Sequence, residues 1–206
     1  MTDLTESAKS RVGGILLAAG TSSRLGQPKQ LLDFHGKPLV RQVAEQALKS
    51  RLGRLHVVVG YHADEVRTAL SGLAIEIVDN HSYQSGQSTS LRTGLLSIPR
   101  DLKAAMILLT DQPFVDSHLI DQLIGLYEES GALIVAPQYK GRRGNPVIFD
   151  QKLHSEILTV VGDTGARDVI ARHRDQLVTL ELTSDQPFLD VDTWEDYHRL
   201  ACESNN

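Results

Sequence analysis

The sequence predicts an α/β fold with a doubly wound, mostly parallel sheet, Rossmann-like, in three α/β/α layers. Apolar runs at residues 15–19, 55–60 and 105–110 are long enough for strands and too short for helices. Amphipathic segments of about a dozen residues separate such runs, a pattern typical of parallel βαβ units. The runs lack polar alternation, as expected of strands covered on both faces.

The remaining elements follow from the same periodicities. Residues 1–11 are a polar lead-in that we expect to be flexible. The expected order is a helix over 38–50 with Pro38 in its first turn, strand 55–60, helix 62–70, strand 74–78, helix 88–97, strand 105–110, helix 116–130 and strand 133–136. Residues 138–183 are less regular and are expected to hold a β-excursion and two helices on one side of the site.

Length, charge and cysteine content narrow the class of protein. A chain of 206 residues with 41% hydrophobic residues is expected to form one domain over 1–206 with a real core. The formal charge of -5 argues against a nucleic-acid partner. Cys202 is the single cysteine, which fits a reducing compartment. The polar N-terminus does not resemble a secretory signal, and no apolar stretch is long enough for a membrane span, so we expect a cytoplasmic protein without a membrane partner.

The first strand leads into a glycine- and hydroxyl-rich loop. After Gly20 come small polar residues and then two cations, Arg24 and Lys29. Glycine permits tight turns, exposed backbone N–H groups suit an anion, and the two cations could close over a polyphosphate. The spacing fits neither GxxxxGK[ST] nor GxGxxG, so it leaves phosphate binding and an ordinary strand-to-helix connection both open.

Aspartates occupy two further strand ends. Asp111 follows the apolar run 105–110, where an acid can hold Mg²⁺ through one oxygen, and Asp116 is better placed to cap the next helix. Asp190 and Asp192 lie two residues apart on an extended segment and so share one side of it. Asp192 or Thr193 could instead cap the last helix. Ligands of doubly wound sheets gather at the carboxyl ends of strands, so a two-carboxylate Mg²⁺ site is predicted there.

These segments together carry a family resemblance. Residues 17–29 match the pattern L-A-A-G-x-S-x-R-x-G-x-P-K, and residues 108–113 match L-x-x-D-x-P. The chain therefore resembles the MobA-like nucleotidyltransferases and is most similar to their molybdenum cofactor cytidylyltransferase branch. Residues 86–95 resemble the family segment that reads the nucleotide base, and 190–197 resemble the family's terminal D-[IV]-D-T-x-E-D-[YF].

The resemblance implies roles for individual residues. The nucleotide-binding candidates are Leu17, Ala18, Ala19, Gly20, Ser22, Arg24, Lys29, Asn80, Gly86, Ser88 and Ser90. Arg24, Lys29 and Asp111 are the catalytic candidates, and Asp111 with Asp192, followed by Asp190, would hold Mg²⁺. Asn145 and Arg167 are candidates for the acceptor side, where Asn145 stands in place of the branch's histidine and puts the identity of the acceptor in doubt.

The resemblance also implies an activity. It predicts an enzyme that transfers a nucleotidyl group, CMP from CTP, to a phosphate acceptor such as molybdopterin, with release of pyrophosphate and with a molybdoenzyme as a conceivable partner. Leu-Ala-Ala-Gly at residues 17–20, in place of a Gly-Gly start, suggests cytosine over guanine. The alternatives are a delivery protein that binds the cofactor without transferring anything, and a transferase for a sugar or alditol phosphate. A nicotinamide-dependent reductase has little support without the dinucleotide fingerprint.

Overall fold

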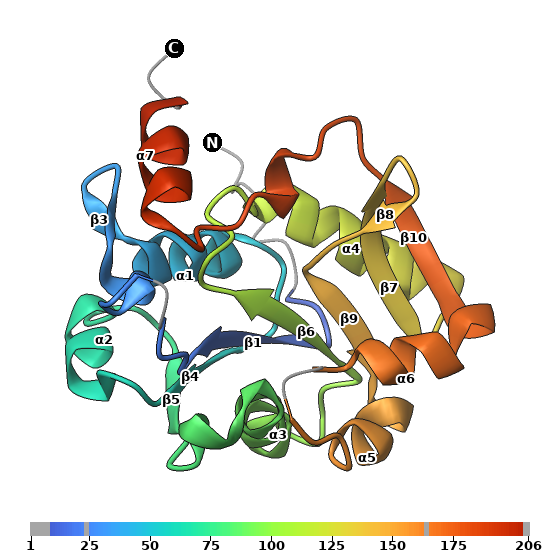
Figure 1. The fold of residues 1–206 in the computed structure, drawn as a ribbon. Coiled ribbons are helices and arrows are strands. Elements are labelled where there is room, and N and C mark those ends of the chain that lie inside the picture. Colours follow the sequence, from blue (N-terminus) through green and yellow to red (C-terminus); the bar gives the residue numbers. More distant parts are fainter. Residues whose placement is uncertain (1–8, 23–24, 163–164, 204–206) are drawn as a thin grey trace, which may run out of the picture.

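The computed structural model describes residues 9–22, 25–162 and 165–203, and Figure 1 shows their arrangement. The strands are β1 (Val12–Ala18), β2 (Asp33–Phe34), β3 (Lys37–Pro38), β4 (Leu55–Val59), β5 (Glu76–Asp79), β6 (Ala104–Leu109), β7 (Ile134–Tyr139), β8 (Arg142–Arg143), β9 (Val147–Asp150) and β10 (Leu177–Glu181). The α-helices are α1 (Leu39–Lys49), α2 (Ala63–Ala69), α3 (Gln87–Ser97), α4 (Ser117–Ser130), α5 (His154–Ile157), α6 (Arg167–Arg172) and α7 (Trp194–Glu203).

The central sheet is mostly parallel, as predicted. Its strand order is β10-β7-β9-β6-β1-β4-β5, with β8 paired to β7, and β2 and β3 form a separate two-stranded ribbon. β1 lies between β4 and β6 and runs parallel to both. β9 is antiparallel to β6 and β7, and it is the β-excursion expected between residues 138 and 183. α5, α6 and β10 follow it and complete this half of the molecule.

Helices cover both faces of the sheet and form the three predicted layers (Figure 1). Apolar residues of α1, α2 and α4 join one buried cluster with alternate sheet residues such as Leu16, Val57 and Met106. Those of α3, α5 and α6 join a second cluster with the intervening residues, among them Ile15 and Val58. Successive strand residues point to opposite faces, so a strand covered on both sides is expected to be almost entirely apolar.

A glycine sets how closely α3 approaches the sheet. A Cβ at Gly94 would lie 2.4 Å from Cγ2 of Ile15 in β1, which is closer than side chains tolerate. Without that Cβ, α3 can pack directly on β1 and β4, and its residues Gln87 and Ser90 lie around the same cavity as Ala19 and Gly20, which follow β1. The polar loop before α3 is thereby brought beside the loop after β1.

Several boundaries differ from the prediction by a few residues. The strand expected over 74–78 is β5, two residues later at its start and one at its end. Pro38 is the last residue of β3 and immediately precedes α1, so its placement in the first turn of the helix was wrong. Asp116 is the N-cap of α4, as predicted, and its side chain accepts a 2.8 Å hydrogen bond from the Leu119 N–H. Capping by a short carboxylate fixes the start of this helix.

Candidate active site

The loop after β1 is closed by two polar side chains. Ser22, at a left-handed φ of 52°, accepts a 3.0 Å hydrogen bond from the backbone N–H of Lys29. The Gln30 side chain, 1% exposed, donates to the carbonyls of Ala18 at 3.1 Å and Gly20 at 2.9 Å. Gln30 therefore holds the end of β1 against the loop. The sequence analysis did not identify Gln30 as a site residue. The only feature of the sequence that could have indicated it is its position next to the candidate Lys29.

Lys29 brings together the two predicted acid-bearing segments. Its ammonium lies 2.5 Å from Oδ2 of Asp111 and 2.9 Å from Oδ1 of Asp192, although these residues are 82 and 163 positions away in the chain. A backbone hydrogen bond of 2.9 Å from the N–H of Val191 to the carbonyl of Asp111 ties the two acidic segments directly. The predicted convergence of a cation from the loop after β1 with two acids is therefore present, but only Asp111 follows a strand. Asp192 lies in the loop before α7, so the expectation that it ends a strand was wrong.

The helix-cap alternative for this segment is resolved in favour of Thr193. Its Oγ1 accepts a 3.1 Å hydrogen bond from the N–H of Asp196, and the Asp196 carboxylate accepts one of 3.0 Å from the N–H of Thr193. This reciprocal pair is a capping box at the start of α7. The cap leaves the carboxylate of Asp192 directed at Lys29.

The charges in this cluster shift one another's ionisation. Burial lowers the pKa of Lys29, but Asp111 and Asp192 outweigh burial and raise that pKa overall, so the side chain is a cation at neutral pH. Burial, and after it the charge of Asp111, raises the pKa of Asp190, although Gln112 donates a 2.7 Å hydrogen bond to the Asp190 carboxylate. Asp190 thus belongs to the same acidic group, but its hydrogen bond is to Gln112, whereas Asp111 and Asp192 bond to Lys29.

The acidic group fits a divalent cation. Oδ1 of Asp111 is buried without a hydrogen-bond partner. Oδ2 of Asp111 and Oδ1 of Asp192 both contact the ammonium of Lys29. Among the described residues, no group of three or more His, Cys, Asp or Glu side chains is arranged to hold a metal. Two carboxylates suffice for Mg²⁺, which is usually held by one or two of them with waters and substrate phosphates in the other positions.

A cavity of about 350 Å³ opens beside this cluster, at the carboxyl ends of β1 and β6. Seven of the predicted site residues line it: Leu17, Ala19, Gly20, Lys29, Gly86, Ser90 and Asp111. Its wall also contains residues that the sequence did not single out as candidates: Thr21, Gln30, Tyr83, Gln84, Gln87, Leu109 and Thr110. The cavity lies where doubly wound sheets place their ligands.

Other predicted nucleotide-binding residues shape the cavity from behind. Asn80, 3% exposed, donates 2.9 Å hydrogen bonds to Oγ1 of Thr89 and Oγ of Ser90. The N–H of Ser88 donates to the carbonyl of Gly162 at 3.1 Å. Ala18, Ser22, Asn80 and Ser88 do not line the cavity. Arg24, a catalytic and nucleotide-binding candidate, lies outside the described residues.

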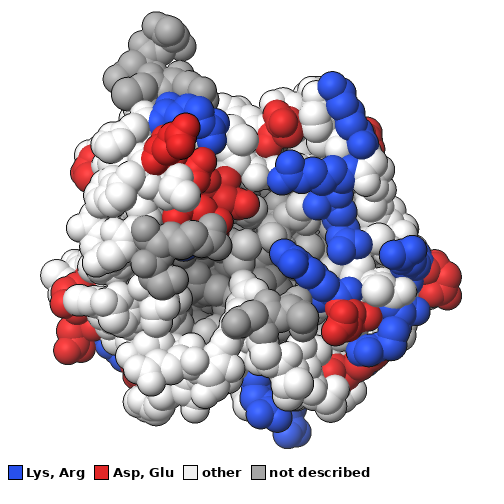
Figure 2. Space-filling view, viewed as in Figure 1, with Lys and Arg blue, Asp and Glu red and all other residues white. Residues whose placement is uncertain are grey.

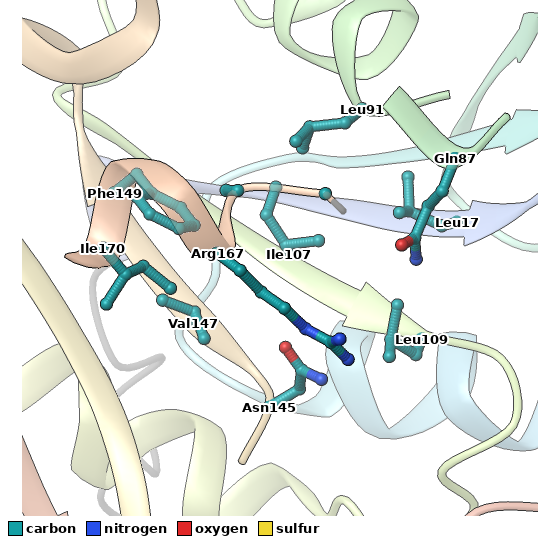
Figure 3. A pocket seen from close by; sticks show the side chains of 12 residues that line it. Leu17, Gln87, Leu91, Ile107, Leu109, Asn145, Val147, Phe149, Arg167 and Ile170 are labelled. Atoms are coloured by element: carbon teal, nitrogen blue, oxygen red, sulfur yellow. The ribbon is translucent and has the colours of Figure 1, made fainter. Parts of the chain in front are cut away.

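The two acceptor-side candidates line a second, adjoining cavity of about 120 Å³. Figure 3 shows the side chains of Asn145 and Arg167 directed toward one another, with Gln87 of α3 across from them. Leu17, Gln87 and Leu109 belong to the walls of both cavities. The two spaces are therefore neighbours separated by a few shared side chains.

Opposite charges flank the hollow between these walls (Figure 2). Asp185, Asp190, Asp192 and Asp196 line a further polar depression beside the Lys29 cluster. Lys and Arg side chains gather across the hollow from the acidic group, on the side where Figure 1 places β8 and α6. Such an arrangement suits a cation on one side and an anionic ligand on the other.

The MobA-like NTP transferase domain model matches residues 14–177. The chain belongs to this family. Membership makes it an enzyme of the nucleotidyltransferase class, which confirms the predicted family and fold class. Divalent metals are typical of such enzymes, although the identity of the metal here stays a prediction. The described chain contains no helix that combines the length and apolarity needed to span a membrane.

Two curated relatives differ in what their names describe. A nicotine blue oxidoreductase of Paenarthrobacter nicotinovorans is 34% identical over 199 residues, which cover 92% of this chain and 96% of that protein. A molybdenum cofactor guanylyltransferase of Xanthomonas euvesicatoria is 50% identical over 52 residues, 25% of this chain and 26% of that protein. Similarity over nearly the whole chain thus reaches a protein named as an oxidoreductase, and similarity over a quarter of the chain reaches one named as a guanylyltransferase.

Solved structures share the architecture over nearly the whole chain. The Rv0371c homologue from Mycobacterium sp. strain JC1 superposes with a TM-score of 0.84 at 31% identity, covering 95% of this chain and 97% of that one. Rv0371c of Mycobacterium tuberculosis in complex with manganese gives a TM-score of 0.78 at 26% identity, with 92% and 97% covered. A divalent cation is thus compatible with this architecture in a related protein.

Proposed function

We propose that this protein, acting as one cytoplasmic domain, transfers a nucleotidyl group from an NTP, CTP by preference, to a phosphate-bearing acceptor of the molybdopterin type, with release of pyrophosphate. One observation carries the proposal. The cation Lys29 lies between Asp111 and Asp192 on the edge of a cavity that the loop after β1 and the loop before α3 also line. Triphosphate and divalent cation would meet at this point.

The residues on each wall have distinct tasks. Lys29 would turn from the carboxylates to the triphosphate and neutralise charge on the departing pyrophosphate. Asp111 and Asp192 would hold Mg²⁺, which when bound neutralises negative charge on the reacting phosphates. Gly86, at a φ of 104° that favours glycine, would let the loop before α3 approach the base and ribose closely.

The reaction needs no protein base. An acceptor phosphate has its second pKa at about 6, so most of it is doubly ionised at neutral pH. One of its oxygens attacks the α-phosphorus, a new phosphorus–oxygen bond forms, and the bond from the α-phosphorus to the bridging oxygen breaks. Pyrophosphate leaves with that electron pair. The chain contributes position and charge, which together account for most catalysis of phosphoryl-type transfer.

The acceptor would approach through the smaller cavity. Arg167 offers a planar fork of donors suited to a phosphate, and Asn145 offers an amide beside it. Since Leu17, Gln87 and Leu109 border both cavities, an acceptor held there lies next to the nucleotide. This adjacency is what an in-line transfer between two bound substrates requires.

The full-length relative named as an oxidoreductase favours a second candidate, a redox enzyme on the same scaffold. A third reading is a delivery protein that binds the nucleotide or cofactor without transferring a group. Pyrophosphate release separates the transferase from the other two candidates, because neither redox chemistry nor simple binding produces it.

The experiment is a panel of CTP, GTP, ATP and UTP with Mg²⁺, each with and without molybdopterin, monitored by pyrophosphate detection. Sugar phosphates and alditol phosphates run in parallel as alternative acceptors. We expect release from CTP only when molybdopterin is present. Release from no NTP with any acceptor would overturn the proposal, and release with a sugar phosphate alone would reassign the acceptor.

A further inference from the structure

The segment that carries Asp192 lies between β10 and α7. Figure 1 shows this part of the chain passing the loop that follows β6. Two hydrogen bonds join the segment to that loop. The side chain of Gln112 donates a 2.7 Å hydrogen bond to Oδ1 of Asp190, and the N–H of Val191 donates one of 2.9 Å to the carbonyl of Asp111. The contact therefore lies immediately before Asp192 in the chain.

Gln112 is placed to hold this segment and not to touch a ligand. The residue is 4% exposed and lines neither of the two cavities. An ionised carboxylate only accepts hydrogen bonds, so the amide nitrogen faces Asp190. The amide oxygen is buried without a hydrogen-bond partner among the described residues. A half-satisfied buried amide costs free energy that an apolar side chain would avoid, which indicates a task for the donating half.

Apolar packing anchors the segment on either side of this contact. Val191 is fully buried in a cluster that includes Phe34 of β2 and Leu200 of α7. The ring of Phe188 is buried over Gly144, where a Cβ would lie 2.2 Å from Cε1 of that ring. The chain is thus fixed before and after the residue that Gln112 binds.

Like charges oppose the approach of the segment to the loop. Asp190 and Asp192 line one polar depression, and the backbone hydrogen bond between the two segments brings Asp111 next to them. Lys29 contacts Asp111 and Asp192. Asp190 has the amide of Gln112 instead. Repulsion among three carboxylates would push the segment away, and the bond from Gln112 opposes this displacement.

We propose that Gln112 is a positioning residue of the metal site, and that Asp190 is its anchor and not a metal ligand. Gln112 fixes the segment through Asp190, and Asp192 then completes the two-carboxylate site with Asp111. The inference rests on the metal site of the proposed function, but not on the identity of the NTP or the acceptor. Replacing a group that orients metal ligands from behind typically weakens metal binding about 10–100-fold.

The test measures binding of Mn²⁺ alone to the full chain, by the loss of the electron paramagnetic resonance signal of free Mn²⁺. Gln112→Met removes the donor at similar side-chain volume. Asp190→Asn keeps an oxygen that can accept from Gln112 but removes the charge, whereas Asp190→Ala removes both. Gln138→Met is the matched control, since Gln138 donates a 3.1 Å hydrogen bond to the carboxylate of Glu181 and lines neither cavity.

We expect the wild type to bind Mn²⁺ saturably, and Gln112→Met and Asp190→Ala to bind it about tenfold more weakly. The double variant should bind no more weakly than either single variant, because both changes break the same bond. Asp190→Asn should stay within about twofold of the wild type, and Gln138→Met should not differ from it. Without metal, the amide of Val191 should exchange hydrogen faster in Gln112→Met than in Gln138→Met.

The results that would overturn the inference are equally specific. Wild-type Mn²⁺ affinity in Gln112→Met would remove its positioning role, and a loss in Asp190→Asn as large as in Asp190→Ala would make Asp190 a ligand. Absence of saturable Mn²⁺ binding to the wild type would remove the site itself. A purely structural role predicts weaker binding only with a lower Tm, whereas we expect Gln112→Met to melt close to the wild type because it also removes the unpaired amide oxygen.

A kinetic arm separates this inference from the proposed function. If transfer occurs, Gln112→Met should raise the Mg²⁺ concentration for half-maximal rate about tenfold and reach the wild-type kcat at saturating Mg²⁺. An unaltered Mg²⁺ dependence would leave the transferase standing and remove the role of Gln112. If no NTP supports pyrophosphate release, the transferase proposal fails, while the Mn²⁺ titration still decides whether Gln112 positions the metal site.

Discussion

Replacing Lys29 with methionine removes a cation that two carboxylates share. The ammonium lies 2.5 Å from Asp111 and 2.9 Å from Asp192, and the side chains of Lys29, Asp111 and Asp192 are 19%, 18% and 37% exposed. At an effective dielectric constant of 20, a contact of 2.5 Å corresponds to a gross attraction of about 7 kcal/mol before desolvation is subtracted.

The net effect on stability is smaller. Breaking a fully buried pair costs about 3–5 kcal/mol, and the partial exposure of these groups lowers the expectation to about 2–4 kcal/mol. For a chain of this size that is a fall in Tm of roughly 5–15 °C without metal. Part of the loss arises because Oδ1 of Asp111 already lacks a partner, so the variant leaves both of its oxygens unpaired.

Added Mg²⁺ provides the decisive comparison. In the wild type the metal must displace the ammonium of Lys29 from Asp111 and Asp192, whereas in Lys29→Met it need not. Thermal denaturation with and without Mg²⁺ should therefore show a larger metal-induced rise in Tm for the variant, although the variant starts lower. A rise that is equal in both proteins, or larger in the wild type, would refute the view that the ammonium and the metal compete for one place.

Lys37→Met is the matched control. Lys37 contacts Glu45 at 2.6 Å, a distance close to that of Lys29 and Asp111, but its side chain is 46% exposed. Surface pairs contribute about 0–1 kcal/mol, so this variant should melt within a few degrees of the wild type. Mg²⁺ should shift its Tm as it shifts that of the wild type.

Three further predictions test other parts of the account. Asp111→Asn should lower the rate of pyrophosphate release by at least about 100-fold while the circular dichroism spectrum stays unchanged, and full Mg²⁺-dependent activity would contradict its role. Gln30→Ala should cost about 1–3 kcal/mol in urea denaturation and raise KM for the NTP, because the carbonyls of Ala18 and Gly20 lose their donor; an unaltered KM would show that the loop keeps its shape without it. His56 is fully buried, neither ring nitrogen has a hydrogen-bond partner, and Oε2 of Glu76 lies 3.8 Å from its Nδ1. Burial lowers the pKa of His56 more than the charge of Glu76 raises it, so the unfolded chain takes up a proton first as the pH falls through about 6.5. His56→Leu should therefore stabilise the fold at pH 7 and stabilise it more at pH 5, and a gain that shrinks on acidification would exclude this reasoning.

The layered fold was predictable because its strands carry their own signal. β1, β4 and β6 are buried on both faces, so each is an apolar run in the sequence, interrupted only by His56 in β4. The edge strand β5 is less buried, and it begins two residues later than predicted. The direction of β9 depends on pairing with distant β6 and β7, which no local pattern encodes.

The two acids of the site could be predicted from where they stand in the chain. Asp111 follows a buried strand and Asp192 precedes a helix, and both are acids in positions that suit a metal. That one lysine contacts both could not be read from residues so far apart in the chain. Gln30 and Tyr83 line the cavity only because the fold turns them toward it, and single amide or aromatic residues carry no sequence signal for such a role.

Asp79 illustrates the converse. Asp79 is the last residue of β5, at the same carboxyl-terminal end of the parallel strands as Asp111. The rule that ligands bind at these strand ends would therefore, by itself, include Asp79 in the site. Its carboxylate instead accepts a hydrogen bond from Arg67 of α2. An edge strand lies away from the crevice, and the position of a strand in the sheet order follows only from the tertiary pairing.

The most direct measurement is anomalous diffraction from crystals grown with Mn²⁺ and α,β-methylene-CTP. The account predicts a manganese peak between the carboxylates of Asp111 and Asp192, with the ammonium of Lys29 moved onto the phosphates. A manganese peak elsewhere, or a nucleotide bound while Lys29 still bridges both carboxylates, would contradict it.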